Sequence, residues 1–210
     1  MPAFEVAAKE MEVYVCARNA IEHAGIPYMV AGGYGVACYA HRRPTKDIDF
    51  LILPADAERA ITALETARFF IRRSDPRWLY QAQCDGIMVD LIFGSTTHRG
   101  IVPITQEWLD HARPIAIGTE TFLVAAPEEL IGQKILAQHE NRADWWDAEM
   151  ILDRWHDQVD WDRIVARTAI DPVKRLSFLL FIESRHSNAG WYPQSTLERT
   201  WREAAAMLGI

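Results

Sequence analysis

Three aspartates are the side chains of this sequence best placed to do chemistry: Asp47, Asp49 and Asp90. Residues two apart on a strand point to the same face, so Asp47 and Asp49 project together if residues 46–53 form the strand that their alternation predicts. Asp90 lies in a second apolar stretch, residues 88–92, where an unpaired carboxylate is costly. Divalent cations relieve repulsion among gathered carboxylates, and magnesium binds through a few carboxylates plus substrate phosphates. The sequence therefore predicts a catalytic metal site for Mg²⁺ or Mn²⁺ at these three positions.

A glycine pair precedes the first two aspartates. Gly32 and Gly33 follow the apolar run 28–31 and precede a short helix expected over residues 34–41. Bare amides at the start of a helix can face phosphate oxygens, and glycine allows close approach because it has no Cβ. The pair taken alone fits a plain tight turn equally well. The order of strand, glycine pair, helix, Asp-x-Asp strand and third aspartate strand is more specific.

The remaining elements give the frame that must position these residues. The first part is mixed: a helix over 7–24, a helix to residue 67 capped by Asp56, a strand at 69–72, and a hairpin of 78–83 with 87–93 across Asp85 and Gly86. Two more strands are expected at 114–117 and 121–124. After residue 127 the pattern turns helical, over 128–141, 144–155, 160–170, 172–186 and 195–208. These elements predict an α+β fold, with a small mixed sheet and flanking helices in residues 1–126 and a helical region in residues 127–210.

Composition narrows the class of protein. The chain has 210 residues, half of them hydrophobic, enough for one large domain or a catalytic domain with a smaller companion. No apolar run is long enough to cross a membrane, and the first ten residues lack the pattern of a signal peptide. Three cysteines in apolar contexts, without metal-type spacing, are typical of reduced thiols in a cytoplasmic protein. The net charge of −7 argues against permanent coating of nucleic acid, but a local basic patch remains compatible with it.

Several of these motifs together resemble a known superfamily. Residues 30–34 (Val-Ala-Gly-Gly-Tyr) and 43–50 (Arg-Pro-Thr-Lys-Asp-Ile-Asp-Phe) resemble the signature of the DNA-polymerase-beta-type nucleotidyltransferases. They are most similar to small bacterial proteins with a GG…R-x-T-x-D-I-D pattern, a group that includes abortive-infection-type toxins. Residues 89–92 resemble the strand of the third carboxylate, and residues 127–131 with Lys134, Arg142, Asp144 and Asp147 resemble the helical segment that follows. The similarity covers roughly residues 20–155. It departs at Gly33, where many members have serine, and at His41-Arg42, where a glycine is common.

The resemblance implies a two-metal mechanism. Asp47 and Asp49 would bridge two magnesium ions, one of which also holds a nucleoside triphosphate. Asp90 would bind the second ion and help to deprotonate an acceptor hydroxyl, which attacks the α-phosphorus and releases pyrophosphate. The nucleotide-binding residues implied are Gly32, Gly33, Arg43, Thr45 and Lys134. The plainer alternatives are strand geometry for Thr45, a solvated charge for Arg43, an exposed helical side chain for Lys134, and a cap or a pairing with Arg142 for Asp144 and Asp147.

The sequence does not decide which molecule accepts the nucleotide. One hypothesis is an enzyme that adds nucleotides to an RNA end, such as a transfer RNA, as a toxin does. An antitoxin protein is then a candidate partner. A second is an enzyme that modifies a small hydroxylated molecule, because aminoglycoside nucleotidyltransferases share the glycine pair and Asp-Ile-Asp but favour histidine where Lys46 stands. A third is a non-enzymatic nucleotide-binding module. The acidic net charge favours a cationic acceptor. Two basic clusters favour RNA instead, although such clusters are also common on solvated faces. The clusters are His41, Arg42 and Arg43, and Arg72, Arg73 and Arg77.

Overall fold

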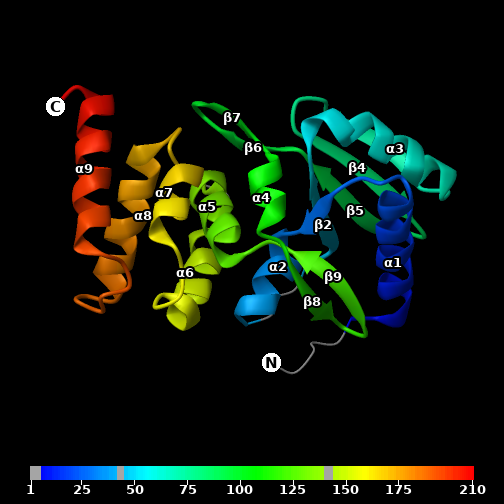
Figure 1. The fold of residues 1–210 in the computed structure, drawn as a ribbon, viewed down its shortest axis with the longest axis horizontal. Coiled ribbons are helices and arrows are strands. Elements are labelled where there is room, and N and C mark those ends of the chain that lie inside the picture. Colours follow the sequence, from blue (N-terminus) through cyan, green and yellow to red (C-terminus); the bar gives the residue numbers. More distant parts are fainter. Residues whose placement is uncertain (1–5, 42–44, 140–143) are drawn as a thin grey trace. The chain divides into compact units, whose positions relative to one another are not determined.

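A computed structural model describes residues 6–41, 45–139 and 144–210 (Figure 1). The chain forms two compact units. Unit 1 contains residues 1–95 and 101–126, and unit 2 contains residues 96–100 and 127–210. Each unit is described below by itself.

A seven-stranded mixed sheet forms the centre of unit 1, in the order β3-β4-β5-β2-β1-β9-β8. The pairs β2–β5 and β1–β9 are parallel, whereas β1–β2, β3–β4, β4–β5 and β8–β9 are antiparallel. The strands are β1 (Tyr28–Val30), β2 (Asp47–Ile52), β3 (Phe70–Asp75), β4 (Leu79–Cys84), β5 (Ile87–Ile92), β8 (Arg113–Ile117) and β9 (Glu120–Val124). The predicted small mixed sheet with flanking helices is confirmed.

Helices α1 (Ala8–His23) and α3 (Ala57–Thr66) cover one face of this sheet (Figure 1). Helix α3 packs against β3 and β4, and α1 packs against β5. The strand residues on this face are apolar and buried, with Ala82, Val89 and Leu91 all at 0% exposure. Apolar residues at alternate positions of these strands are therefore buried, as expected for strands with one face packed on the core. The other face of β2 and β5 is left for the polar side chains described below.

Two local predictions in unit 1 have different outcomes. The turn at Asp85-Gly86 is confirmed, since both residues have positive φ (52° and 80°) and Cys84 pairs directly with Ile87. The cap by Asp56 is wrong, because its side chain makes no cap hydrogen bond. A 3-10 turn, η1 (Pro54–Asp56), precedes α3 instead, and the Asp56 carboxylate accepts a hydrogen bond from Arg59.

Residues 94–110 contain elements that the sequence pattern did not predict. A two-stranded hairpin pairs β6 (Gly94–Thr97) with β7 (Gly100–Pro103), and the short helix α4 (Gln106–Asp110) follows. Gly94–Thr97 has no alternation of apolar and polar residues, and the five residues of α4 are too few to show a helical period.

Unit 2 is helical, as predicted. Its helices are α5 (Pro127–Ala137), α6 (Asp144–Trp155), α7 (Trp161–Arg167), α8 (Pro172–Arg185) and α9 (Gln194–Leu208). Two of them begin with an aspartate cap. Asp160 accepts from the backbone amides of Asp162 and Arg163, and Asp171 accepts from that of Lys174. Such caps satisfy amides that the first helical turn leaves without partners.

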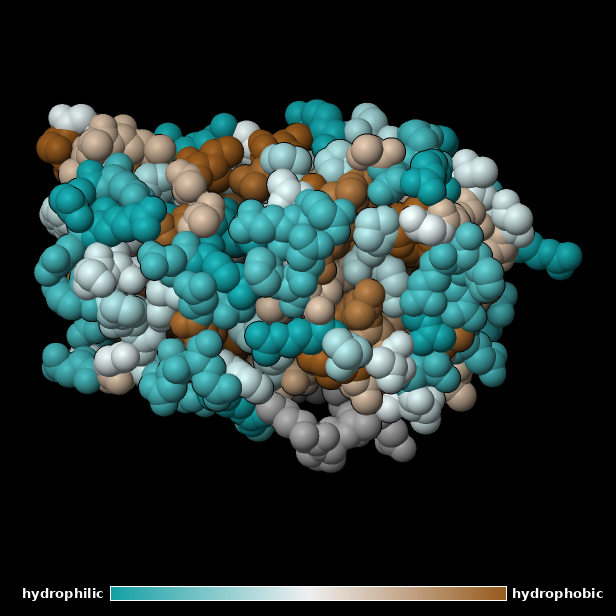
Figure 2. Space-filling view, viewed as in Figure 1, coloured by the Kyte–Doolittle hydropathy of each residue, from teal (hydrophilic) through white to brown (hydrophobic). Residues whose placement is uncertain are grey.

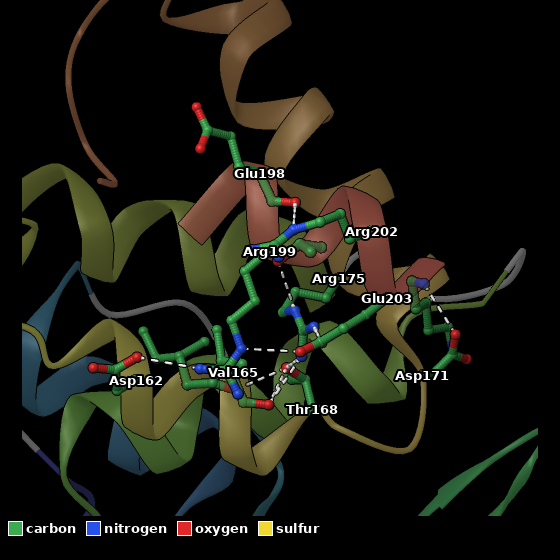
Figure 3. Close-up of polar contacts among 12 residues, drawn as sticks. Asp162, Val165, Thr168, Asp171, Arg175, Glu198, Arg199, Arg202 and Glu203 are labelled. Carbon is green, nitrogen blue, oxygen red and sulfur yellow. Dashed lines mark hydrogen bonds and ion pairs between the residues drawn. The ribbon is translucent and has the colours of Figure 1, made fainter. Parts of the chain in front are cut away.

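Buried charges in unit 2 are matched by opposite charges or by hydrogen-bond partners. Figure 3 shows the guanidinium of Arg175, which is 0% exposed and lies among α7, α8 and α9. It donates to the Val165 carbonyl (2.9 Å), the Thr168 hydroxyl (3.1 Å) and the Thr200 hydroxyl (3.0 Å), and it pairs with Glu203. These contacts compensate the cost of burying a cation, which is high when the charge is left alone.

The surface is mainly hydrophilic on the face seen in Figure 2, where apolar residues form small separate patches. Apolar side chains are exposed at the end of α9 and just after it, with Leu208 54% and Ile210 84% exposed. None of the described helices combines the length and the apolar character that a membrane-spanning helix needs.

Candidate active site

The pairing of β2 with β5 brings the predicted aspartates together. These strands are parallel, and Asp49 is the direct partner of Asp90 in the register. Directly paired residues point to the same face, and Asp47, two residues before Asp49, shares that face. The three carboxylates therefore lie on the sheet face opposite the one that carries Ala82, Val89 and Leu91.

The glycine pair lies directly against two of the site residues. Helix α2 (Gly32–Tyr39) begins at the pair, and Gly32 has φ +55°. A Cβ added at Gly32 would lie 1.6 Å from Asp49 Oδ2, and one added at Gly33 would lie 2.8 Å from Thr45 Oγ1. No side chain fits at Gly32, so close approach of backbone to the Asp49 carboxylate requires glycine. A plain tight turn would not need this approach.

Thr45 connects the glycine pair to the first aspartate. Its hydroxyl donates to Asp47 Oδ1 over 3.0 Å, and the same side chain is the one that a Cβ at Gly33 would meet. Thr45 lies before the first residue of β2, so its contribution is a contact within the site rather than strand geometry.

Asp90 is the most buried of the three aspartates, at 9% exposure. Burial raises the pKa of its carboxyl, the Gln81 amide lowers it, and the negative charge of Asp47 raises it again, with a net shift upward. Burial disfavours the charged form, and a second carboxylate nearby does the same. Asp90 is thus partly desolvated and has a second carboxylate nearby, an environment in which a cation would be favoured.

Gln81 and Ser74 belong to the site although the sequence analysis missed them. Gln81 is the direct partner of Asp90 across β4 and β5, and its Nε2 donates to Asp90 Oδ1 over 3.0 Å. The Ser74 hydroxyl donates to Gln81 Oε1 over 2.7 Å, which fixes the orientation of the amide. Counting back from the Asp85-Gly86 turn, with Cys84 opposite Ile87, places Gln81 opposite Asp90, so the hairpin prediction already contained the signal that identifies Gln81.

A divalent cation fits the donor set of this site. No group of three or more His, Cys, Asp or Glu side chains forms a ready-made metal cage within residues 6–41, 45–139 and 144–210. Magnesium needs no such cage, since it keeps several waters and takes one or two carboxylates together with substrate phosphates. The crowding of Asp90 by Asp47, and the backbone held against Asp49, are the features that suit a hard cation and a phosphate.

The two remaining predicted site residues, Arg43 and Lys134, are not among the contacts described above. Arg43 is outside the described residues, as are Arg42 and Arg142. Lys134 belongs to unit 2 and is buried rather than exposed, with its ammonium 2.8 Å from carboxylate oxygens of both Asp144 and Asp147. Both aspartates thus have a structural partner in Lys134, whereas the pairing with Arg142 expected from the sequence lies outside the described residues. A contact of Lys134 with a triphosphate stays a prediction.

The second basic cluster is partly neutralised. Arg73 pairs with Glu58 over 2.9 Å, and Arg77 pairs with Asp75 over 2.7 Å. Each is exposed, so each pair contributes little to stability. Arg72 is exposed on the opposite face of β3 from Arg73, as the alternation of a strand requires.

A mixed sheet with aspartates on paired strands, beside a helix that begins at a glycine pair, defines a nucleotidyltransferase-type fold. Solved structures agree. The antibiotic-resistance factor ANT(2'')-Ia in solution is 11% identical, with a TM-score of 0.55, and the match covers 86% of this chain and 99% of that one. The crystal structure of ANT(2'')-Ia in complex with adenylyl-2''-tobramycin is 12% identical, with a TM-score of 0.57, over 78% of this chain and 97% of that one. At such identities the likeness shows the fold alone.

The sequence itself identifies the family. Residues 8–182 match the family described as "Uncharacterised nucleotidyltransferase", and the chain belongs to that family. No curated protein shows significant sequence similarity to it. The protein is therefore a nucleotidyltransferase, which confirms the superfamily and sets aside the non-enzymatic module. The narrower GG…R-x-T-x-D-I-D group stays a prediction.

Proposed function

We propose that the protein transfers a nucleoside monophosphate from a nucleoside triphosphate to an acceptor hydroxyl, with Mg²⁺ or Mn²⁺ as the cofactor. The observation that carries this proposal is the pairing of Asp49 with Asp90 across two parallel strands, with Gly32 packed against Asp49. Carboxylates and close backbone amides are the groups needed to hold a metal-bound triphosphate.

The roles follow from position. Asp49 lies against Gly32, and Asp47 is joined to Thr45, which lies against Gly33. These two aspartates would hold the cation that arrives with the triphosphate, and Gly32 and Gly33 would let the backbone approach its phosphates. Thr45 orients Asp47 through its hydrogen bond. When bound, the divalent cation supplies neutralisation of the charge that develops on the phosphate oxygens.

Asp90 serves the acceptor. The acceptor oxygen forms a bond to the α-phosphorus while the bond from that phosphorus to the bridging oxygen breaks, and pyrophosphate leaves. The hydroxyl proton passes to the Asp90 carboxylate, whose Oδ1 is already held by Gln81.

An RNA end is the acceptor that we put first, with a transfer RNA and a toxin role as its most specific form; an antitoxin partner belongs to that role. A small hydroxylated molecule is the second candidate. It is supported by the fold shared with ANT(2'')-Ia, solved with adenylyl-2''-tobramycin, and by a net charge of −7 that suits a cationic acceptor.

Calorimetric titration with a nonhydrolysable nucleoside triphosphate, with and without Mg²⁺, tests the metal and nucleotide roles. We expect binding that depends on Mg²⁺ in the wild type and is lost when Asp47→Asn and Asp49→Asn are combined. Asp85→Asn is the matched control, because it removes the same charge from an exposed turn and asparagine tolerates positive φ there. Metal-independent binding that survives the double substitution would contradict the proposal.

A further inference from the structure

The sheet register extends the site beyond the aspartates, along two rows of side chains that cross four strands on one face. Each row follows from direct partners in the pairings β3–β4, β4–β5 and β5–β2. The first row is Arg72, Gln81, Asp90 and Asp49, and the second is Phe70, Gln83, Met88 and Asp47. Residues on β3 and β4 thus share the face of the catalytic aspartates, although they come from the outer edge of the sheet.

The outer ends of both rows are exposed. Phe70 is 72% exposed, which is unusual for a phenylalanine, and Arg72 and Gln83 are exposed as well. The inner residue Gln81 differs, because its amide is already engaged by Asp90 and Ser74. We call Phe70, Arg72 and Gln83 the edge strip.

The position of the edge strip matches the direction from which an acceptor must come. The glycine pair lies at the β1 side of Asp49, so the triphosphate occupies that side. Asp90 lies on the other side, and β4 and β3 follow it in the strand order. Neighbouring strands are about 4.8 Å apart, so the edge strip begins about 5 Å from the Asp90 strand, at Gln83 on β4, and reaches Phe70 and Arg72 on β3 roughly 10 Å away. A molecule that presents a hydroxyl to Asp90 and extends away from the triphosphate lies over the edge strip.

Resting on the proposed function, the geometry points to the edge strip as the binding site of the acceptor, and to the terminal nucleotides of a single-stranded RNA as its occupant. An exposed aromatic ring is a stacking surface for a base, and an arginine in the neighbouring row pairs with a backbone phosphate. A cationic antibiotic gains nothing from Arg72, whose charge would repel it. The neighbour Arg73, which points to the other face and pairs with Glu58, has no part in the strip.

Binding of a short, 5′-fluorescein-labelled single-stranded RNA with a free 3′ hydroxyl, measured by fluorescence anisotropy without metal or nucleotide, tests this inference. We expect Arg72→Gln to weaken binding and to reduce the slope of log affinity against log salt by about 0.7, the value for one phosphate contact on a single strand. Arg73→Gln is the matched control on the same strand, and it leaves both the affinity and the slope unchanged.

Phe70 gives an independent arm of the experiment. Phe70→Ala weakens RNA binding by roughly tenfold, within the range that base stacking contributes, and Phe70→Tyr restores it. Leu123→Ala, at another exposed apolar side chain of the sheet, has no effect. The inference is overturned if the wild type does not bind RNA, if Arg72→Gln and Arg73→Gln behave alike, or if tobramycin competes for a site that depends on Phe70 and Arg72.

Failure of the inference is separable from failure of the proposed function. The RNA titration contains neither Mg²⁺ nor triphosphate, whereas the calorimetric titration contains no acceptor. Loss of Mg²⁺-dependent nucleotide binding contradicts the proposed function only, and RNA binding that ignores the edge strip contradicts the inference only.

Discussion

Glu129 in unit 2 and the aspartates Asp47 and Asp90 in unit 1 differ in the charge of the groups that donate hydrogen bonds to them. In unit 2, Glu129 is 0% exposed and lies between two guanidinium groups, 2.7 Å from Arg163 and 3.1 Å from Arg167. In unit 1, the donors that the described residues provide to Asp47 and Asp90 are neutral: the Thr45 hydroxyl and the Gln81 amide. Unit 2 therefore neutralises Glu129 internally, whereas these two hydrogen bonds in unit 1 orient Asp47 and Asp90 without cancelling their charge.

We interpret this difference as two roles of charge. A structural role stabilises the fold through complete ion pairs, and a binding role leaves a carboxylate charged for a ligand. A buried ion pair that is complete resists change, because removal of either partner leaves the other charge uncompensated. A carboxylate that is held in place by neutral groups keeps its charge for a cation from solution, at some cost in stability. Charge balance thus distinguishes Glu129, which stabilises the fold, from the aspartates that are proposed to bind a cation.

The largest expected effect is on nucleotidyl transfer, and it tests the proposed binding role of the charge of Asp90. We predict that Asp90→Asn lowers nucleotidyl transfer by at least the roughly 10²–10⁴-fold that proton transfer contributes, while nucleotide binding stays largely intact. Asparagine has nearly the same size but no charge to bind a cation or to receive the acceptor proton. The measurement is transfer of labelled nucleotide to total RNA and, separately, to a panel of aminoglycosides. A similar rate of labelling by wild type and variant would show that Asp90 does not serve the acceptor.

A smaller effect is expected on stability, and it tests the structural role of the Glu129 ion pairs. We predict that Glu129→Ala lowers the free energy of unfolding by about 3–5 kcal/mol, because Arg167 keeps a buried charge without its carboxylate. Glu198→Ala, on an exposed face of α9, is the matched control and changes stability by less than about 0.5 kcal/mol. Denaturant unfolding followed by circular dichroism measures both. Equal stabilities of the two variants would remove the distinction between the units.

The smallest effect has the opposite sign. We predict that Asp90→Asn stabilises the metal-free protein by about 0.5–2 kcal/mol, since it removes a carboxylate that burial and Asp47 both disfavour in its charged form. Thermal unfolding in the presence of a chelator measures the change. A lower melting temperature for the variant than for the wild type would mean that the charge of Asp90 is already balanced within the protein.

Local chemistry made much of this structure predictable from the sequence. Alternation of period two located β2 and placed Asp47 and Asp49 on one face, and the Asp-Gly dipeptide between two apolar stretches located the β4–β5 hairpin. The superfamily resemblance, carried by the glycine pair and the aspartates, is confirmed by the family match. These features depend on residues that are close in sequence.

Some details could not be predicted, because they depend on which partner a residue finds in the folded chain. The gathering of the three aspartates on one sheet face was expected, but the register that makes Asp49 the direct partner of Asp90 joins strands separated by α3, β3 and β4, and no local pattern encodes it. Lys134 is buried because two aspartates on the next helix reach it, which helix propensity cannot show. Asp56 satisfied the composition rule for a cap, but its hydrogen bond with Arg59 replaced the capping geometry.

The strand order has a consequence for how such an enzyme can diversify. The aspartates lie on β2 and β5, each flanked by strands on both sides, where substitutions disturb a packed core. Phe70 and Arg72 lie on β3, the last strand of the sheet, where side chains are exposed and replacements are tolerated. With the edge strip as the proposed acceptor site, substitutions on this outer strand would change which molecule is modified, while the proposed catalytic aspartates on the inner strands stay the same.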